Sequence, residues 1–419
     1  MPSGFYLLIA AQFVSALADN ALLILAAALL QEQGFAPWWA PMLKFSFTIS
    51  YVLLAPFMGP FADAVPKTKL MIWMNGLKTI GVLLMFTAIH PVLAYAVVGV
   101  GAAAYAPAKY GLITEWVPAR LLVRANGWIE ISVVLAALSG TVLGGFLASA
   151  WYASTPFALV IGAVIGPALH GLGLPLVSKL LASLVLVLVL YGVAALLQSG
   201  VRTGVVTYPP TAFQVSALVR DFAAANRRLW RDPEGGLTLT VTTLFWGVGA
   251  TVQFAVLRWA KDVLQLPMDG AAYLQAVVAI GVVMGAGLAG AWVALGAAWR
   301  VLPAGVLLGL MISGAALTTG LPTTLPALSL VGVVGGILVV PMNALLQHRG
   351  HQLLTAGRSI AVQGFNENLS ILVMLGAYAA CLALDWPIVP MLVVFGLLVA
   401  LAMAAIIWAH AQQRRKPSA

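Results

Sequence analysis

The sequence has very little charge. Only 8% of its 419 residues are Asp, Glu, Lys or Arg, whereas about a quarter of the residues in an ordinary soluble domain are charged. Hydrophobic residues make up 62% of the chain. This balance excludes a water-soluble globular protein and also a disordered one. Most of the chain must therefore face lipid or other apolar helices.

The sequence also has a single cysteine, Cys381, which lies in an apolar run. One cysteine excludes a disulfide framework and a cysteine-based metal site. The five histidines do not begin a His-x4-Asp pattern, and no Gly-x4-Gly-Lys-Ser/Thr nucleotide loop is present. We therefore predict no catalytic residue, no metal, no cofactor and no enzymatic activity.

Long apolar runs fill most of the chain and are separated by Gly, Pro or charged residues. At about 20 residues per membrane helix, the chain has room for twelve spans. Helices are expected because an open sheet edge cannot be satisfied in hydrocarbon. The sequence thus predicts an all-α integral membrane protein. The predicted spans are 5–30, 40–62, 70–89, 92–113, 126–148, 178–199, 237–260, 271–295, 301–320, 326–347, 359–382 and 388–409.

Lysine and arginine are distributed unevenly among the predicted loops. If both termini are cytoplasmic, only Lys179 and Lys261 lie on the outer side, whereas 16 of the 21 basic residues lie on the inner side. This asymmetry is the positive-inside bias. We therefore predict a multi-pass protein of the bacterial inner membrane with both termini in the cytoplasm. The inner set is Lys67, Lys69, Lys109, Arg120, Arg124, Arg202, Arg220, Arg227, Arg228, Arg231, Arg300, Arg349, Arg358, Arg414, Arg415 and Lys416.

The longest polar segment, 200–236, divides the chain into two halves. It carries Pro209–Pro210, followed by apolar residues interleaved with arginines, which is typical of an amphipathic helix on the inner membrane face. The halves share an offset, because Val98-Gly99-Val100 recurs 233 positions later as Val331-Gly332-Val333. We predict an N-terminal six-helix bundle over 1–199, a cytoplasmic linker over 200–236 and a C-terminal six-helix bundle over 237–419. Residues 149–177 are expected to be an inserted outer-side hairpin or re-entrant element.

A basic turn joins the second and third predicted spans. It reads Gly59-Pro60-Phe61-Ala62-Asp63-Ala64-Val65-Pro66-Lys67-Thr68-Lys69 and resembles the inter-helix signature of the major facilitator superfamily. Asp63 suits a facing helix N-terminus, where the dipole favours an anion. We predict an inner gate whose partner is the start of the eleventh span, near 355–359; a plain basic turn is the alternative. The predicted gating residues are Gly59, Asp63, Lys67, Lys69, Lys109 and Arg358.

Several charged and amide residues lie inside predicted spans. Such residues are costly in hydrocarbon and usually face a cavity or a partner. We expect Asp19 and Asn20, which are adjacent in the first span, to line a cavity. Structural pairing is favoured for Lys78, while both roles stay open for Glu130 and Glu367. The predicted substrate-binding residues are Asp19, Asn20, Gln253, Arg258, Lys78, Glu130, Glu367 and Asn343.

Longer runs resemble the bacterial lysophospholipid transporter family, a branch of the major facilitator superfamily. The runs are Gln12–Leu22, Val98–Gly111, Leu122–Gly127 with Glu130, Leu244–Gly247, Val339–Gln347 and Ile360–Gln363 with Glu367-Asn368. They are spread over nearly the whole chain. The resemblance implies inward flipping of lysophosphatidylethanolamine and lysophosphatidylglycerol by alternating access, followed by reacylation.

The resemblance also implies roles for the polar residues. Asp19 would bind the ethanolamine ammonium, Asn20 and Gln253 would bind glycerol or phosphate oxygens, and Arg258 or Lys78 would bind the phosphate. The expected partners are the lysophospholipid, membrane lipids and a cytoplasmic acyltransferase/acyl-carrier-protein synthetase. No nucleic acid and no obligate oligomer is expected. The alternative is a proton-coupled exporter of drugs or small solutes on the same fold.

Overall fold

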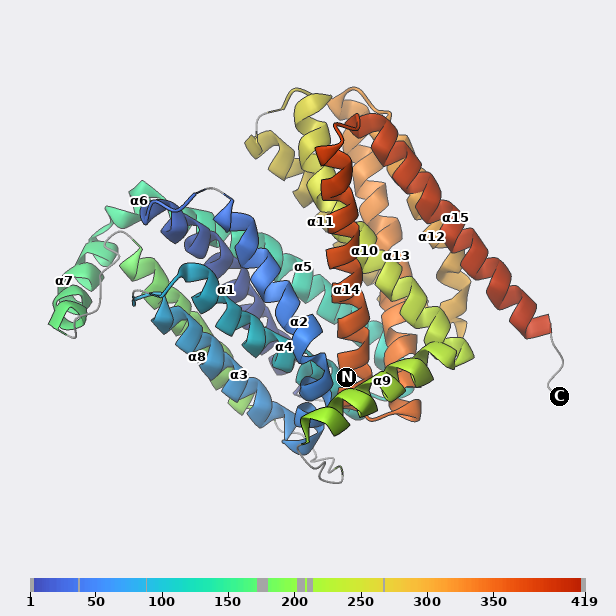
Figure 1. The fold of residues 1–419 in the computed structure, drawn as a ribbon, viewed down its shortest axis with the longest axis horizontal. Helices are drawn as coiled ribbons and strands as arrows, with labels where there is room; N and C mark the ends of the chain where they lie inside the picture. Colours follow the sequence, from blue (N-terminus) through green and yellow to red (C-terminus); the bar gives the residue numbers. More distant parts are fainter. Residues whose placement is uncertain are drawn as a thin grey trace. The chain divides into compact units, whose positions relative to one another are not determined.

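The computed structural model of this chain describes residues 4–36, 38–87, 89–171, 180–201, 208, 214–266 and 268–415. Every regular element within these ranges is a helix (Figure 1). The prediction of an all-α protein is therefore confirmed.

Within the part of the chain that the structure describes, twelve long helices fall on the twelve predicted spans. The first six are α1 (Phe5–Glu32), α2 (Trp39–Ala64), α3 (Lys67–Leu84), α4 (Pro91–Trp116), α5 (Leu122–Leu147) and α8 (Leu181–Ser199). The other six are α10 (Pro233–Asp262), α11 (Met268–Trp292), α12 (Leu302–Ala316), α13 (Leu321–Leu353), α14 (Ala356–Ala383) and α15 (Ile388–Arg415). Two 3-10 helices, η1 (Ala119–Leu121) and η2 (Leu295–Val301), precede α5 and α12.

Eleven helices within the described residues are long and apolar enough to cross a membrane. The helix missing from that set is α3, which has three lysines, Lys67, Lys69 and Lys78, among its 18 residues. Lysine is tolerated inside a membrane protein when the side chain finds a partner in the protein. The partners of α3 are therefore part of the candidate site described below.

Two further segments connect the long helices. The segment predicted as an insertion contains α6 (Ala150–Ala153) and the apolar α7 (Pro156–Gly171), while its last residues, 172–177, and Lys179 lie outside the described residues. The linker contains α9 (Val215–Arg231). Arg202, Pro209–Pro210 and Lys416 also lie outside the described residues.

The chain forms two compact units, and the boundary between them passes through α5. Unit 1 comprises residues 1–116 and 135–219, and unit 2 comprises residues 117–134 and 220–419. In unit 1, α2 and α3 pack on α4, and α1 and α3 pack on α8. In unit 2, α11 packs along α13, α12 along α15, and α10 along α14. The division into bundles at the linker stays a prediction.

Glycines allow equivalent helix pairs to approach closely in the two units. A Cβ on Gly99 of α4 would meet the backbone of Phe47 in α2 at 2.9 Å. A Cβ on Gly332 of α13, 233 positions later, would overlap the carbonyl oxygen of Val278 in α11. Small residues at such positions are the usual means of close helix packing in membranes. The repeated Val-Gly-Val motif therefore marks the same packing position in each unit.

The linker helix α9 is fixed to unit 2 through its apolar face. Ala225 and Leu229 of α9 form a buried cluster with Leu239, Leu346 and Val362. After α9, the Asp232 carboxylate accepts hydrogen bonds from the backbone N–H groups of Glu234 and Gly235 and so caps the N-terminus of α10.

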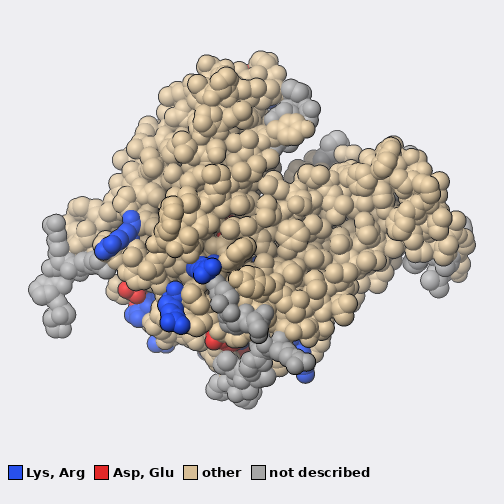
Figure 2. All heavy atoms as spheres, turned by 180° about the vertical axis from the view of Figure 1, so that it is seen from behind, with Lys and Arg blue, Asp and Glu red and all other residues tan. Residues whose placement is uncertain are grey.

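A bidentate pair also joins this cap to α13. The Arg349 guanidinium donates to both carboxylate oxygens of Asp232, with distances of 2.9 and 2.8 Å. This fork is the strong geometry for an arginine–carboxylate pair. In unit 2, α9 and the C-terminal end of α15 lie at the same end of the helices (Figure 1). On the face seen in Figure 2, lysine and arginine also gather toward the lower end.

Candidate functional site

A buried ion pair lies at the centre of unit 1. The Lys78 ammonium of α3 is 2.8 Å from an Asp19 carboxylate oxygen of α1. The exposed fraction is 2% for the Lys78 side chain and 16% for the Asp19 side chain. The pair explains how α3 carries a lysine inside the bundle, because each charge neutralises the other. Asp19 is the more accessible partner.

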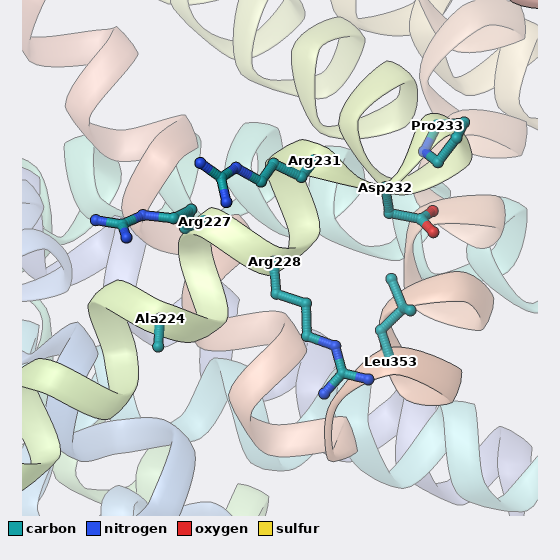
Figure 3. A pocket seen from close by; sticks show the side chains of 7 residues that line it. All are labelled: Ala224, Arg227, Arg228, Arg231, Asp232, Pro233 and Leu353. Carbon is teal, nitrogen blue, oxygen red and sulfur yellow. The ribbon is translucent and has the colours of Figure 1, made fainter.

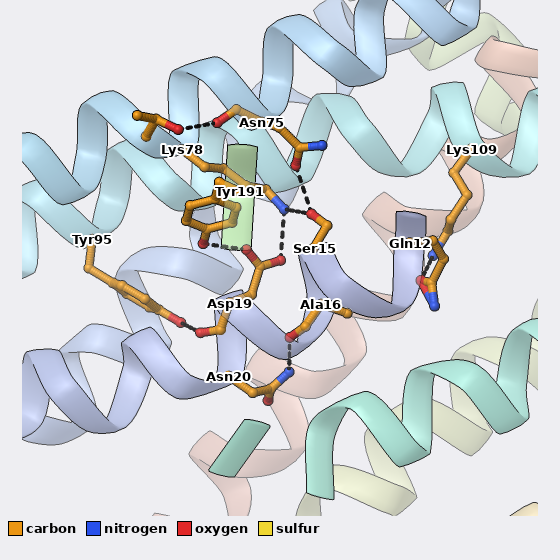
Figure 4. Close-up of polar contacts among 11 residues, drawn as sticks. Gln12, Ser15, Ala16, Asp19, Asn20, Asn75, Lys78, Tyr95, Lys109 and Tyr191 are labelled. Carbon is orange, nitrogen blue, oxygen red and sulfur yellow. Dashed lines mark hydrogen bonds and ion pairs between the residues drawn. The ribbon is translucent and has the colours of Figure 1, made fainter. Parts of the chain in front are cut away.

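Polar and aromatic side chains complete this cluster (Figure 4). Lys78 also donates to the Ser15 hydroxyl at 3.1 Å, and Ser15 in turn donates to the Asn75 side-chain oxygen at 2.8 Å. The Tyr191 hydroxyl donates to the other Asp19 carboxylate oxygen at 2.7 Å. Both charged groups are thus oriented by additional hydrogen bonds. We call Ser15, Asp19, Asn75, Lys78 and Tyr191 the unit 1 network.

Two tyrosine rings also contact the Lys78 cation. The ammonium lies 5.0 Å from the ring centre of Tyr105 in α4 and 5.7 Å from that of Tyr191 in α8. Contacts of this kind stabilise a desolvated cation. The Tyr105 hydroxyl is buried and has no hydrogen-bond partner among the described residues. The lysine is therefore bound by groups from α1, α4 and α8.

Asn20 does not join the unit 1 network. Its side-chain amide donates to the carbonyl oxygen of Ala16, one turn earlier in α1, at 2.8 Å. A second polar contact of α1 lies further along the helix, where Lys109 of α4 donates to the Gln12 side chain at 3.2 Å. Lys109 is buried and also lies over the Tyr110 ring.

The basic turn between α2 and α3 forms a second ionic cluster in unit 1. Lys67 lies 2.7 Å from Glu115 of α4 and 3.8 Å from Asp63, and all three side chains are buried. The Tyr208 hydroxyl of the linker donates to Glu115 at 2.7 Å. Lys67 therefore pairs with both acids, and its shorter contact is with Glu115. Lys69 is exposed.

Unit 2 contains a network built mainly from amides. The Gln363 side chain of α14 donates to Asn343 of α13 at 3.0 Å and to Glu367, one turn later, at 2.8 Å. Glu130, from the part of α5 that belongs to unit 2, is buried and interacts electrostatically with Glu367. Three of the predicted site residues, Asn343, Glu130 and Glu367, therefore belong to one polar region.

A reciprocal amide pair lies in the same unit. Asn126 and Gln347 each donate to the side-chain oxygen of the other, and both distances are 2.9 Å. Both side chains are buried, with exposed fractions of 3% and 1%. The pair fixes this segment of α5 to α13. Close by, Gly127 allows α5 to approach the backbone of α11.

Comparison with known proteins identifies the family. The family model of the Major Facilitator Superfamily matches residues 8–373. The lysophospholipid transporter LplT of Salmonella arizonae is 38% identical over 411 residues, which cover 98% of this chain and 96% of that protein. LplT of Escherichia coli O1:K1 is 39% identical over 407 residues, covering 97% and 96%. The chain belongs to the lysophospholipid transporter family of the Major Facilitator Superfamily.

Solved structures confirm the predicted fold. The transporter FucP in its outward conformation has a TM-score of 0.73 at 16% identity, covering 99% of both chains. The human organic anion transporter MFSD10 has a TM-score of 0.72 at 12% identity, covering 98% of this chain and 100% of that one. At such low identity the likeness concerns the fold alone. This member of the lysophospholipid transporter family is thus a multi-pass membrane protein with the superfamily fold.

In this member of the family, two predicted substrate contacts lie apart from the polar networks. Gln253 of α10 is exposed, and its backbone carbonyl accepts a hydrogen bond from the Gln275 side chain at 2.7 Å. Arg258, one turn and a half later, pairs with Asp262 at 3.2 Å, and both side chains are more than a third exposed. Neither residue contacts a described member of the networks.

Sequence reasoning missed several residues of the polar clusters in unit 1. Ser15, Asn75 and Tyr191 were not expected, because isolated polar residues in apolar runs are typical of ordinary packing. Tyr208 was missed because a tyrosine in the polar linker gives no sign of its partner. A usable signal existed for Tyr191, since a buried tyrosine hydroxyl in a membrane span needs a partner and Asp19 is an obvious acceptor.

Proposed function

We propose that this protein flips lysophosphatidylethanolamine and lysophosphatidylglycerol inward across the bacterial inner membrane by alternating access of its two halves. The observation that carries the proposal is the identity of 38–39% over nearly the full length of proteins named lysophospholipid transporter. Similarity of this extent covers both units and all the long helices. It favours the lipid substrate over the drug or small solute of a generic exporter.

The unit 1 network suits a zwitterionic headgroup. The Asp19–Lys78 pair presents one anion and one cation 2.8 Å apart. An ethanolamine ammonium can replace Lys78 at Asp19, while the substrate phosphate takes the place of Asp19 at Lys78. Each charge of the protein then exchanges one partner for another, so no buried charge is left unpaired. Lysophosphatidylglycerol has no ammonium to offer Asp19, so its phosphate would bind Lys78 while Lys78 stays paired with Asp19, and its glycerol would lie near Asn20.

The polar region of unit 2 would offer neutral contacts to substrate oxygens. Asn343 and Gln363 present amide groups that suit phosphate and glycerol oxygens. Glu130 and Glu367 would line the path beside them. We assign Gln253 and Arg258 to the outer part of α10, where Arg258 would attract a phosphate before it reaches the site.

The ionic cluster of the α2–α3 turn would act as the inner gate. Gly59, Asp63 and Lys67 would form its core, with Lys69 at the surface. Lys109 and Arg358 would contribute at the ends of α4 and α14. Closing this gate would require Asp63 to meet the N-terminus of α14, where Thr355 already caps the helix.

In the cell, the transporter would have a fixed orientation in the inner membrane and a partner enzyme on its cytoplasmic side. Both termini, the linker and the gate would lie in the cytoplasm, in agreement with the positive-inside bias. The transporter would act as a monomer without catalytic activity of its own. A cytoplasmic acyltransferase/acyl-carrier-protein synthetase would reacylate the lysophospholipid and thereby drive net inward movement.

The proposal is tested by flipping of fluorescent lysophosphatidylethanolamine in proteoliposomes. The comparison includes the wild type, Asp19→Asn combined with Lys78→Met, and Lys261→Gln as a control at an exposed lysine. We expect flipping that depends on the wild-type protein, persists in the control and is lost in the double variant.

Other outcomes would change the proposal in defined ways. Flipping that persists in the double variant would keep the substrate but move the site away from Asp19 and Lys78. No flipping by folded wild-type protein would refute the lysophospholipid substrate and favour the exporter, to be tested next with a panel of drugs.

A further inference from the structure

The linker helix α9 has an arginine face that the transport mechanism does not use. Arg227, Arg228 and Arg231 follow Ala224 by three, four and seven positions, so all four lie on one side of the helix. They are all exposed. The opposite side of α9 packs on unit 2, where Leu229 is fully buried. The arginines therefore lie outside the buried contacts that hold α9 in place.

These arginines have no counter-ion among the residues that the structure describes. None of the three guanidinium groups forms a hydrogen bond or an ion pair with a described residue. The acid next to them in sequence, Asp232, is already bound through both oxygens by Arg349. Three unpaired cations on one face favour an external anion.

An open surface pocket, called the cavity below, lies against this face (Figure 3). It has a volume of about 470 Å³ and is lined by the four residues of the arginine face together with Asp232, Pro233 and Leu353. Figure 3 shows the Arg228 side chain directed toward Leu353 at the end of α13. The cavity thus combines guanidinium groups with an apolar wall and is much larger than a simple ion.

A second feature of α9 indicates that the anion belongs to a lipid. Val215, Val219 and Trp230 are 56%, 44% and 40% exposed, and they lie on the flank between the buried face and the arginine face. Exposed apolar residues beside cations are typical of a helix at the boundary between acyl chains and headgroups. An acidic soluble protein would match the arginines but would leave this apolar flank unexplained.

We propose that the arginine face of α9 and the end of α13 bind the phosphate of an anionic phospholipid, such as phosphatidylglycerol, in the cytoplasmic leaflet. Guanidinium groups match phosphate with two parallel hydrogen bonds. The Asp232 carboxylate at the rim is neutralised by Arg349 and repels the phosphate little. The bound lipid is a resident ligand at a place separate from the unit 1 network.

The test measures lipid retention by the purified full-length protein in detergent, using native mass spectrometry with phosphatidylglycerol or phosphatidylethanolamine. The pocket variant combines Arg227→Gln, Arg228→Gln and Arg231→Gln. A matched control combines three exposed arginines that lie outside α9 and do not line the cavity, and its changes are Arg120→Gln, Arg124→Gln and Arg300→Gln. Both variants lose the same net charge.

We expect the wild type and the control to retain phosphatidylglycerol in preference to phosphatidylethanolamine. The pocket variant should lose affinity by about fivefold for each arginine removed, as expected for about 1 kcal/mol per cation at an anionic surface. If the triple variant does not fold, Arg228→Gln alone replaces it in the test, and its affinity for phosphatidylglycerol should fall about fivefold. Free glycerol phosphate should not displace the lipid.

Three results would overturn the proposal. Equal losses in the two triple variants would mean that net charge alone attracts the lipid. Displacement of the lipid by millimolar glycerol phosphate would identify a small-anion site. Equal retention of both lipids by the wild type would refute an anionic phospholipid as the ligand. An acidic cytoplasmic protein would then be the better candidate. Flipping assays of lysophosphatidylethanolamine are independent of all three results.

Discussion

Changing Asp19 to asparagine removes the only carboxylate that pairs with Lys78 among the described residues. The Lys78 side chain is 2% exposed and cannot reach water without a rearrangement of α3. Its contacts with Ser15 and with two tyrosine rings exist before and after the change, so they do not compensate. Leaving one member of a buried ion pair unpaired costs about 3–5 kcal/mol. Asp19→Asn should therefore lower stability as well as transport.

The sequence alone leads to a different expectation for this residue. If Asp19 only lined a cavity, its replacement would abolish transport and leave the amount of folded protein unchanged. The ion pair with Lys78 is the physical reason to expect a loss of both. A loss of transport by Asp19→Asn alone is thus ambiguous, which is why the flipping assay uses the double variant.

A double-mutant cycle separates the two contributions. Thermal unfolding in detergent is compared for the wild type, Asp19→Asn, Lys78→Met and the double variant. We expect each single change to lower the unfolding temperature by several degrees, and the double variant to recover most of the loss because no charge remains buried. Additive losses, or single variants as stable as the wild type, would refute the reasoning.

Two more predictions concern unit 2. Replacing either Asn126 or Gln347 with leucine leaves one buried amide unsatisfied and should lower the free energy of unfolding by about 1–3 kcal/mol. The double replacement should lower it by less than the sum of the two single changes. Additive losses in thermal unfolding would contradict the pairing. Hydrogen bonds from Arg349 hold the pKa of Asp232 below its usual range. The stabilisation is therefore present at neutral pH and lost as the pH falls through the lowered pKa. Arg349→Gln should be less stable than the wild type at neutral pH and should converge with it in acid, whereas a constant difference would exclude an ionic contribution.

The spans and the family could be predicted because both depend on local sequence. Apolar runs determine which segments enter the membrane, and the observed α4 (Pro91–Trp116) and α13 (Leu321–Leu353) each contain the predicted span. The shared Val-Gly-Val motif survives in both halves because only glycine allows the backbones to approach as they do at Gly99 and Gly332.

The partners of the buried charges could not be predicted in the same way. Lys78 is 59 positions from Asp19, and Tyr191 is 172 positions from it. Contacts over such separations depend on which helices become neighbours, and hydropathy does not encode that choice. Glu115 shows the same difficulty, because the sequence places it near Lys109 whereas the fold pairs it with Lys67.

The division of α5 between the two units has a consequence for attempts to cut the protein into halves. A break in the linker would leave residues 117–134 on the first polypeptide, although their packing partners, including Gln347, belong to unit 2. The first fragment would then expose Asn126 and Glu130 to lipid, and the second would have an empty groove beside α11 and α13. The halves of this gene are therefore not interchangeable modules, and co-expressed fragments would have to exchange a helix segment to recover the native fold.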